Sequence, residues 1–395
     1  MLRERFGRKP KVKNFPQYKK AVGKEGIISL IAMIAFFGAL SWKIGFVPMM
    51  QSMFTISYNL LIDVCFYIMA IAVIAGALAG FLTEFGIIAL INFILYPLMM
   101  PIFGLPGAAA MGILTTFLSD NPAILTLCDD ERFRAYFKRY QLPALTNLGT
   151  AYGMGLIVIV FVLGLQTMTD ERMGLSIGVG LLGAVVGSIV STRLMLRRTA
   201  KLYGKEEWCV PGAQQNQEKE KPMRKVRVGS VPTRLMDALL EGGASGVKVG
   251  FSIIPGVLII CTIVMLLTYT PDHPTTPGVG FLPWLGKQLD FILVPLFGFS
   301  SPEGLSVPIT ALGSAGAAIG LLPDLLKEGF INGKDIAVFT SMCMCWSGYL
   351  STHVAMMDSL NSRELTGSAI LSHTIGGAAG GIAANWIYQL IQLMM

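Results

Sequence analysis

Two short stretches of sequence, 198 residues apart, decide the fold. Residues 93–98 read FILYPL and residues 291–296 read FILVPL, so five of the six positions match. Each copy lies in an apolar region that several prolines interrupt, residues 84–129 in the first case and 287–327 in the second. Proline lacks the backbone N–H and breaks helices. Neither region is therefore expected to form one straight helix, and the match indicates an internal repeat.

The same order of elements surrounds both copies. Each unit is expected to hold one apolar span, an interfacial helix, a re-entrant helical hairpin and then two more spans. The first unit covers residues 57–198 and the second covers 234–395. Three crossings is an odd number, so the second unit would be inverted relative to the first. Inverted repeats with broken helices near the bilayer midplane are typical of secondary transporters.

The composition places the chain in a membrane. Of its 395 residues, 53% are hydrophobic and 14% are charged, and the mean hydropathy is +0.62. A soluble domain carries about 25% charged residues. An ordinary cytosolic enzyme is excluded, and an all-α polytopic membrane protein is predicted, with the lipid bilayer as its first partner. Seven stretches are long and apolar enough to cross: residues 26–46, 57–82, 142–166, 173–192, 249–269, 336–357 and 366–393.

The basic residues predict the orientation. With the N-terminus in the cytoplasm and alternating spans, 26 of the 31 Lys and Arg fall on the cytoplasmic side, as the positive-inside rule requires. The net charge of +7 is thus accounted for without nucleic acid. The predicted organisation is a cytoplasmic basic arm (1–25), a first transmembrane helix with an outer loop (26–56), the first repeat (57–198), a cytoplasmic linker (199–233) and the second repeat (234–395).

Three motifs carry a resemblance to known proteins. Gly104–Gly107 (GLPG) resembles the nucleoside-recognition, or Gate, domain of bacterial membrane proteins. Gly242–Lys248 (GGASGVK) is similar to the start of the second half of concentrative nucleoside transporters, and Cys345–Ser351 (CWSGYLS) is similar to their tail. The resemblance covers residues 57–395, mostly as pattern. It implies a bacterial inner membrane location and a homo-oligomer.

The resemblance also implies a site. In such transporters two hairpin tips meet two partly unwound helices and enclose the substrate and a coupling ion. Carried over by position, the substrate- and ion-binding residues lie in four segments. They are Ser119, Asp120 and Asn121 in the first tip, Asn147 and Thr150 in the first unwound helix, Ser314 in the second tip, and Trp346 and Ser347 in the second unwound helix.

The first tip departs from the family pattern. In the nucleoside transporters it reads Gly-Gln-Thr-Glu-Ala, whose side chains hold the nucleobase, whereas here it reads Ser119-Asp120-Asn121-Pro122. The substrate is therefore expected to be a small polar organic solute, with a nucleoside-like compound as one option.

Two of these groups have a structural alternative. Asp120 and Asn121 precede a proline, which is a strong signature of helix capping, but a carboxylate at membrane depth also favours a bound cation or donor. Asn147 and Thr150 lie in an uncharged, Gly-rich span, where they offer oxygens to Na⁺ or simply join helices. A Na⁺ ion near Asn121, Asn147 and Thr150 is one hypothesis, and no other cofactor or metal is expected.

His353 and His373 are isolated in apolar stretches. A proton relay would need an ionisable partner, which the sequence does not indicate, so core histidines with satisfied hydrogen bonds are favoured. The chain has no Walker loop, HExxH motif, serine elbow or CxxC pair, and no enzymatic activity is predicted.

The leading hypothesis is a secondary-active transporter of a small polar solute, coupled to Na⁺ or H⁺. The alternative is a non-transporting membrane scaffold that keeps the Gate fold and serves a partner in an envelope process. A hydrated chamber between the two tips would favour the transporter, and a tightly packed one would favour the scaffold.

Overall fold

The computed structural model describes residues 23–119, 121, 123–129, 131–210 and 226–394. Within them the protein is α-helical, as predicted, apart from an isolated bridge between Lys138 and Trp208. Five helices of this part of the chain are long and apolar enough to cross a membrane, or seven if two sharply bent pairs are each counted as one crossing. Most of the predicted basic arm and residues 211–225 of the predicted linker lie outside the described residues.

The first half of the chain forms helices in this order: α1 (Lys24–Ile44), α2 (Phe46–Asn59), α3 (Phe66–Glu84), α4 (Ile87–Leu98), α5 (Ala110–Leu118), α6 (Ala123–Asp129), α7 (Glu131–Arg134), α8 (Leu142–Thr150), α9 (Gly155–Gly164) and α10 (Met173–Tyr203). A π-helical segment joins α2 to α3, so Phe46–Glu84 is one helix of 39 residues.

The second half repeats this order with α11 (Val231–Gly256), α12 (Thr262–Thr268), α13 (Phe281–Phe297), α14 (Ser306–Gly313), α15 (Ala315–Gly320), α16 (Leu322–Lys327), α17 (Gly333–Cys345), α18 (Tyr349–Ser359) and α19 (Thr366–Met394). A π-helical segment again joins α11 to α12, giving a helix of 38 residues. Each half thus contains a long helix, a bent helix, a pair of short helices, a broken helix and a second long helix.

The structure differs from the sequence prediction at residues 47–56. An outer loop was expected there, but α2 is helical throughout. Gly45 ends α1 with φ +85°, and Pro48 falls in the first turn of α2, where it removes no intrahelical bond. The chain therefore turns within one residue and starts a new helix.

The last two predicted spans are helical, and the first of them is broken at residues 346–348, where the resemblance implied an unwound helix. Residues 336–357 are divided between α17 and α18, and α19 is one helix of 29 residues. Neither is among the helices that qualify as crossings by length and apolarity in the described residues. Residues 336–357 do not qualify because the helix is interrupted. α19 does not qualify because it is rich in glycine and polar residues.

Both bent helices turn at equivalent places. The helix pair Ile87–Phe103 and Gly107–Leu118 bends by 110°, and the pair Phe281–Phe297 and Pro302–Gly313 bends by 80°. Gly104 (φ +78°) and Gly298 (φ +67°) directly follow the first member of each pair. Prolines remove helical hydrogen bonds and glycine accepts the left-handed backbone. The interrupted regions predicted from the prolines are confirmed, while entry and exit on the same membrane face remain a prediction.

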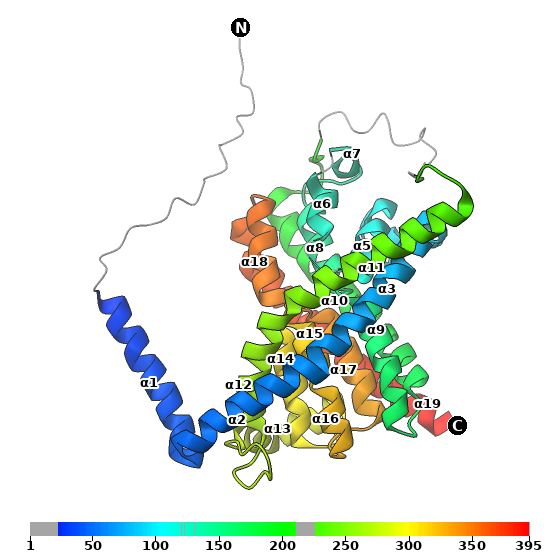
Figure 1. Ribbon diagram of the computed structural model, residues 1–395. Helices are drawn as coiled ribbons and strands as arrows, with labels where there is room; N and C mark the ends of the chain where they lie inside the picture. Colours follow the sequence, from blue (N-terminus) through cyan, green and yellow to red (C-terminus); the bar gives the residue numbers. More distant parts are fainter. Residues whose placement is uncertain (1–22, 120, 122, 130, 211–225, 395) are drawn as a thin grey trace.

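Two helix crossings hold the halves together (Figure 1). α3 lies across α11 so closely that a Cβ on Gly76 would overlap the carbonyl of Gly242. α10 lies across α19 in the same way, since a Cβ on Gly187 would lie 2.7 Å from the carbonyl oxygen of Gly376. Small residues allow backbones to approach this closely, which is how helices associate in lipid.

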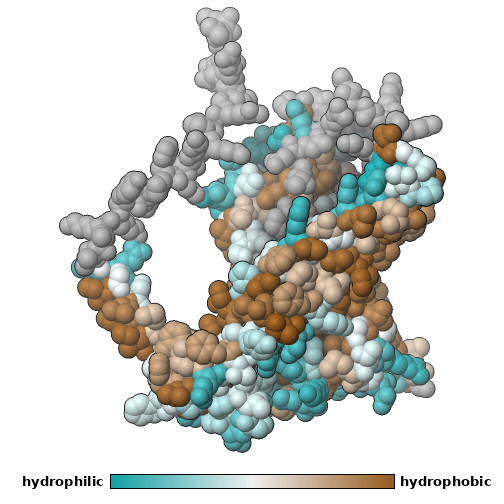
Figure 2. Space-filling model, in the orientation of Figure 1, coloured by the Kyte–Doolittle hydropathy of each residue, from teal (hydrophilic) through white to brown (hydrophobic). Residues whose placement is uncertain are grey.

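Segments predicted to share a membrane side contact one another. On the predicted cytoplasmic side, Arg139 pairs with Glu207 at 2.9 Å and Tyr203 donates to Glu364 at 2.6 Å. On the predicted outer side, the Ser52 hydroxyl donates to the Pro277 carbonyl at 3.0 Å. α6 and α7 lie at the opposite end of the molecule from α13 and α16 (Figure 1). Hydrophobic residues cover the middle of the face shown in Figure 2, along α1 and the α3–α11 crossing, and hydrophilic residues gather at its lower end.

Candidate functional site

Two helices are interrupted near the centre of the molecule. The first break covers residues 151–154, between α8 and α9, and the second break covers residues 346–348, between α17 and α18. A residue in the left-handed conformation ends each break, Met154 with φ +55° and Gly348 with φ +64°. An interrupted helix leaves backbone N–H and C=O groups without helical partners, so other parts of the protein must satisfy them in a membrane.

The first tip (residues 119–122) contacts the second break. The side-chain amide of Asn121 donates to the carbonyl of Ser347, which is 226 residues away. Asn121 and Ser347 are both buried. A Cβ on Gly153 of the first break would overlap Asn121 Oδ1 and lie 2.9 Å from Ser347 Oγ. The first tip is therefore clamped between the two breaks. Asp120 and Pro122 lie outside the described residues.

The second tip (residues 313–316) contacts the same break from α14. The backbone N–H of Gly348 donates to the carbonyl of Ala311 at 3.1 Å. A Cβ on Gly348 would lie 2.9 Å from the Gly313 carbonyl oxygen and 3.9 Å from the Ser314 Cα. The Ser314 hydroxyl caps α15 by accepting from the Ala317 N–H at 3.2 Å. Both tips thus meet at residues 346–348.

The other predicted site residues point elsewhere. Asn147 donates to Ser191 Oγ and to the Ala369 carbonyl, both at 3.0 Å. The Thr150 hydroxyl donates to Met356 Sδ at 3.8 Å. The proposed Na⁺ ligands Asn121, Asn147 and Thr150 therefore have separate partners in this arrangement. Trp346 packs against Gly377 in α19.

The structure reveals a contact that sequence analysis missed. The rings of His353 (α18) and His373 (α19) are 4.7 Å apart between centroids, and both are fully buried. The Ser191 hydroxyl is 2.9 Å from His373 Nδ1 and also accepts from Asn147. Only the three-dimensional pairing of α18 with α19 brings the two rings together, and no sequence spacing signals it.

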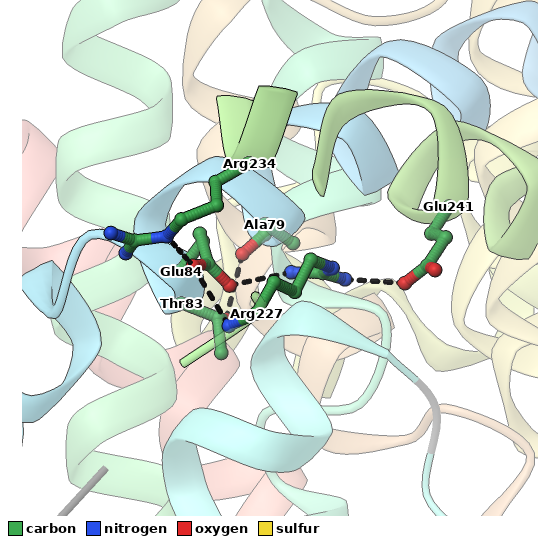
Figure 3. A network of polar contacts seen from close by, with 6 residues as sticks. All are labelled: Ala79, Thr83, Glu84, Arg227, Arg234 and Glu241. Carbon is green, nitrogen blue, oxygen red and sulfur yellow. Dashed lines mark hydrogen bonds and ion pairs between the residues drawn. The ribbon is translucent and has the colours of Figure 1, made fainter. Parts of the chain in front are cut away.

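A second polar cluster lies at the end of the α3–α11 crossing (Figure 3). Glu84, the last residue of α3, is only 3% exposed and accepts from Arg227 Nη1 and Arg234 Nε, both at 2.7 Å. Arg227 also donates to Glu241. The two carboxylates, Glu241 first, raise the pKa of the Arg227 guanidinium above its usual value. This cluster joins the first half of the chain to the second.

A cleft of about 310 Å³ runs from this cluster to the first tip. Its lining includes Thr83, Ser119, Arg227, Glu241 and Ser245. Among the described site residues, Ser119 alone lines it, while Asn121, Asn147, Thr150, Trp346 and Ser347 are buried. Both tips are thus packed on the second break, and the cleft reaches the first tip from one end.

The overall fold resembles that of a concentrative nucleoside transporter. No family model and no curated protein matches the sequence. Solved structures of the transporter CNTnw do resemble it. In the inward-facing, substrate-bound state the TM-score is 0.52 at 14% identity, over 91% of this chain and 84% of that chain.

Two further states of CNTnw are similar to the same degree. A variant in an intermediate state has a TM-score of 0.54 at 13% identity, over 91% of this chain and 85% of that chain. A variant in an outward-facing state has a TM-score of 0.52 at 12% identity, over 91% and 84%. The structural neighbours are transporters and not enzymes. The predicted fold class is confirmed.

Proposed function

We propose that this protein is a secondary-active membrane transporter of a small polar organic solute, working by alternating access between its two halves. The observation that carries the proposal is the meeting of both tips at the second break, through the Asn121 bond to the Ser347 carbonyl and the close approach of Gly313 to Gly348, which also bonds to the Ala311 carbonyl just before the second tip. A movement of either tip must release a backbone group of this break. The likeness to CNTnw in inward-facing, intermediate and outward-facing states supports the proposal.

Burial of polar groups around the breaks supports a solute site there. Asn121, Asn147, Thr150 and Ser347 are buried inside a bundle of apolar helices, where polar side chains are expensive and are usually functional. The closed tips correspond to a state without access to the centre, and the cleft that reaches Ser119 is the route by which a solute would approach. We place the protein in the bacterial inner membrane, with its N-terminus in the cytoplasm, as a homo-oligomer.

The test is solute binding followed by transport. The purified full chain is screened for thermal stabilisation by nucleosides, nucleobases, amino acids and dipeptides, with and without Na⁺, since a ligand that binds the native state raises the unfolding temperature. Compounds that stabilise the protein are then loaded into proteoliposomes for exchange assays. Exchange of a stabilising compound supports the proposal, and failure of every class to stabilise or exchange contradicts it.

A matched pair of variants ties the result to the tips. Asn121→Ala removes the bond to the second break, and we expect it to reduce exchange by at least tenfold. Ser57→Ala removes a comparable bond, that to the Thr262 hydroxyl at 2.9 Å, which joins α2 to α12 away from both tips. We expect it to exchange like the wild type. If the wild type, Asn121→Ala and Ser57→Ala exchange solute equally, the tips take no part in transport.

One observation favours the alternative function. The five buried site residues do not line the cleft described above, and the described residues of both tips are packed on the second break. A membrane scaffold that keeps this fold would look the same. It would show no stabilisation by any solute class, and cross-linking in intact cells would instead recover a constant protein partner.

A further inference from the structure

Two buried histidines form a unit that the proposed site does not use. His353 and His373 are 0% exposed, and their ring centroids are 4.7 Å apart. His373 Nε2 bonds to the carbonyl of Cys345, the residue just before the second break, and His353 Nδ1 bonds to the carbonyl of Tyr349, the residue just after it. The pair therefore holds both flanks of the second break.

The hydrogen bonds fix the neutral forms of both rings. A carbonyl oxygen can only accept, so His373 Nε2 carries a hydrogen. His373 Nδ1 then accepts from the Ser191 hydroxyl at 2.9 Å, and Ser191 in turn accepts from Asn147 at 3.0 Å. Every bond in this chain has one donor and one acceptor, so both ring nitrogens of His373 are engaged.

His353 differs from His373 in the hydrogen bonding of one ring nitrogen. Its Nδ1 donates to the Tyr349 carbonyl at 3.1 Å, which leaves the lone pair on Nε2. That Nε2 is buried and has no hydrogen-bond partner among the described residues. A ring nitrogen with a free lone pair is the atom at which a neutral imidazole takes up a proton. The pair thus offers one open position, on Nε2 of His353.

Among the described residues, no charge compensates a proton at that position. α8 and α14, which pack against α18, carry no titratable side chain. The titratable groups beside the pair are Tyr349 of α18 and Cys345 of α17, which are uncharged near neutral pH.

Charged side chains on the same helices are engaged elsewhere. Arg193 of α10 donates to the carbonyls of Pro101 and Ile102, and Asp358 of α18 pairs with Arg363 at 2.5 Å. An unpaired charge in an apolar interior is strongly unfavourable. A proton on the pair is therefore tolerated only if water reaches it, which requires the second break to move.

We propose that His353 and His373 form the proton-binding site of this carrier, so that solute movement is coupled to H⁺ and not to Na⁺. One proton passes from the solution on one side to Nε2 of His353, loosens the second break, and returns to the solution on the other side. His373 is a positioning residue that transmits the change to Cys345. This inference rests on the proposed transport function, which the experiments below separate from it.

The first experiment detects the proton without any solute. The chain has three histidines, so ¹⁵N-histidine labelling gives three imidazole signals, which single His→Gln variants assign. His273, in the loop after α12, is the internal control. We expect His353 to take up one proton between pH 8 and pH 5, together with faster amide exchange in residues 344–353. A His353 ring that stays neutral throughout that range, or titrates without any change in those amides, would overturn the inference.

The second experiment measures coupling in proteoliposomes with labelled uridine, alanine and glycylglycine as probes. We expect a pH gradient to drive at least tenfold accumulation of the transported probe, and a Na⁺ gradient to drive none. His353→Gln should abolish accumulation but keep exchange, and His273→Gln should accumulate and exchange like the wild type. Accumulation driven by Na⁺, or unchanged in His353→Gln, contradicts H⁺ coupling while leaving transport intact. Absence of exchange for every probe contradicts transport itself, and the histidine titration still decides the proton site.

Two controls guard against misfolding. His373→Asn keeps a polar side chain, and we expect it to retain proton uptake at His353 while losing the amide response of residues 344–353. Thermal unfolding of each variant identifies any that fail to fold, and the wild-type titration is independent of all of them. If a folded His373→Asn variant takes up no proton, the proton binds to His373 and not to His353, and the proposed roles of the two rings are overturned.

Discussion

The two helix breaks occupy equivalent places in the two halves but hold different chemistry. The first break contacts the first tip at Gly153 and links to α10 through Tyr152, whose hydroxyl lies 2.8 Å from that of Ser188. The second break contacts both tips and is flanked by the carbonyls that bind His353 and His373. A repeated backbone therefore does not imply a repeated role. In the proposed mechanism, the second break is where movement of the tips and the state of the histidines converge.

The largest expected effect comes from filling the space between the breaks. Gly153→Leu would push against Asn121 and Ser347, and overpacking a close-packed site costs about 1–3 kcal/mol. We expect a clear fall in thermal unfolding temperature and loss of exchange. Gly174→Leu in α10, where a Cβ would meet no described atom within 4 Å, should unfold and exchange like the wild type. Equal behaviour of both variants would show that the breaks are not in contact.

The next largest effect is expected from alanine substitutions at two glycines that have nearly the same φ angle. Gly348 has φ +64° and Gly280 has φ +65°, so alanine at either position costs about 1–2 kcal/mol of left-handed strain. Only Gly348→Ala also meets a carbonyl, that of Gly313 at 2.9 Å. We therefore expect Gly348→Ala to unfold at a lower temperature than Gly280→Ala and to exchange solute more slowly. The opposite ranking would place the second tip away from the second break.

The smallest effect distinguishes the breaks by their links to α10. Ser188→Ala removes the bond to Tyr152 of the first break, and Ser191→Ala removes the bond to His373. Each lost hydrogen bond costs about 1 kcal/mol, so both variants should unfold at similarly reduced temperatures. Only Ser191→Ala should change the pH dependence of accumulation, since it frees His373 Nδ1. If accumulation by both variants depends on pH in the same way, Ser191 does not influence the proton site.

Much of the fold could be predicted because its signals are local. Hydropathy indicated the apolar helices, and prolines such as Pro97 and Pro295 marked the bent ones. The helix at residues 47–56 was not predicted, since an outer loop was expected after the first span. The long extension of α11 back to Val231 was missed because polar residues were taken to end the span.

The site was predictable only where the family pattern named it. Asn121 and Ser347 meet as expected, although they are 226 residues apart. Asn147 and Thr150 were expected beside them, but their side chains bond to residues of α10, α18 and α19. The contact between the two histidine rings depends on the packing of α19 against α18. The bonds of Glu84 to its two arginines depend on the crossing of α3 with α11. Long-range packing of this kind leaves no periodic signal in one sequence.

The ion pairs of Glu84 with Arg227 and Arg234 join parts of the chain that residues 211–225 also connect covalently. The α3–α11 and α10–α19 crossings bring the same two halves into backbone contact. We therefore expect the two halves to assemble without covalent continuity between them. Two fragments, divided within residues 211–225 and co-expressed, should recognise each other in the bilayer and rebuild the intact fold. Such a fold could then be encoded as one polypeptide or as two.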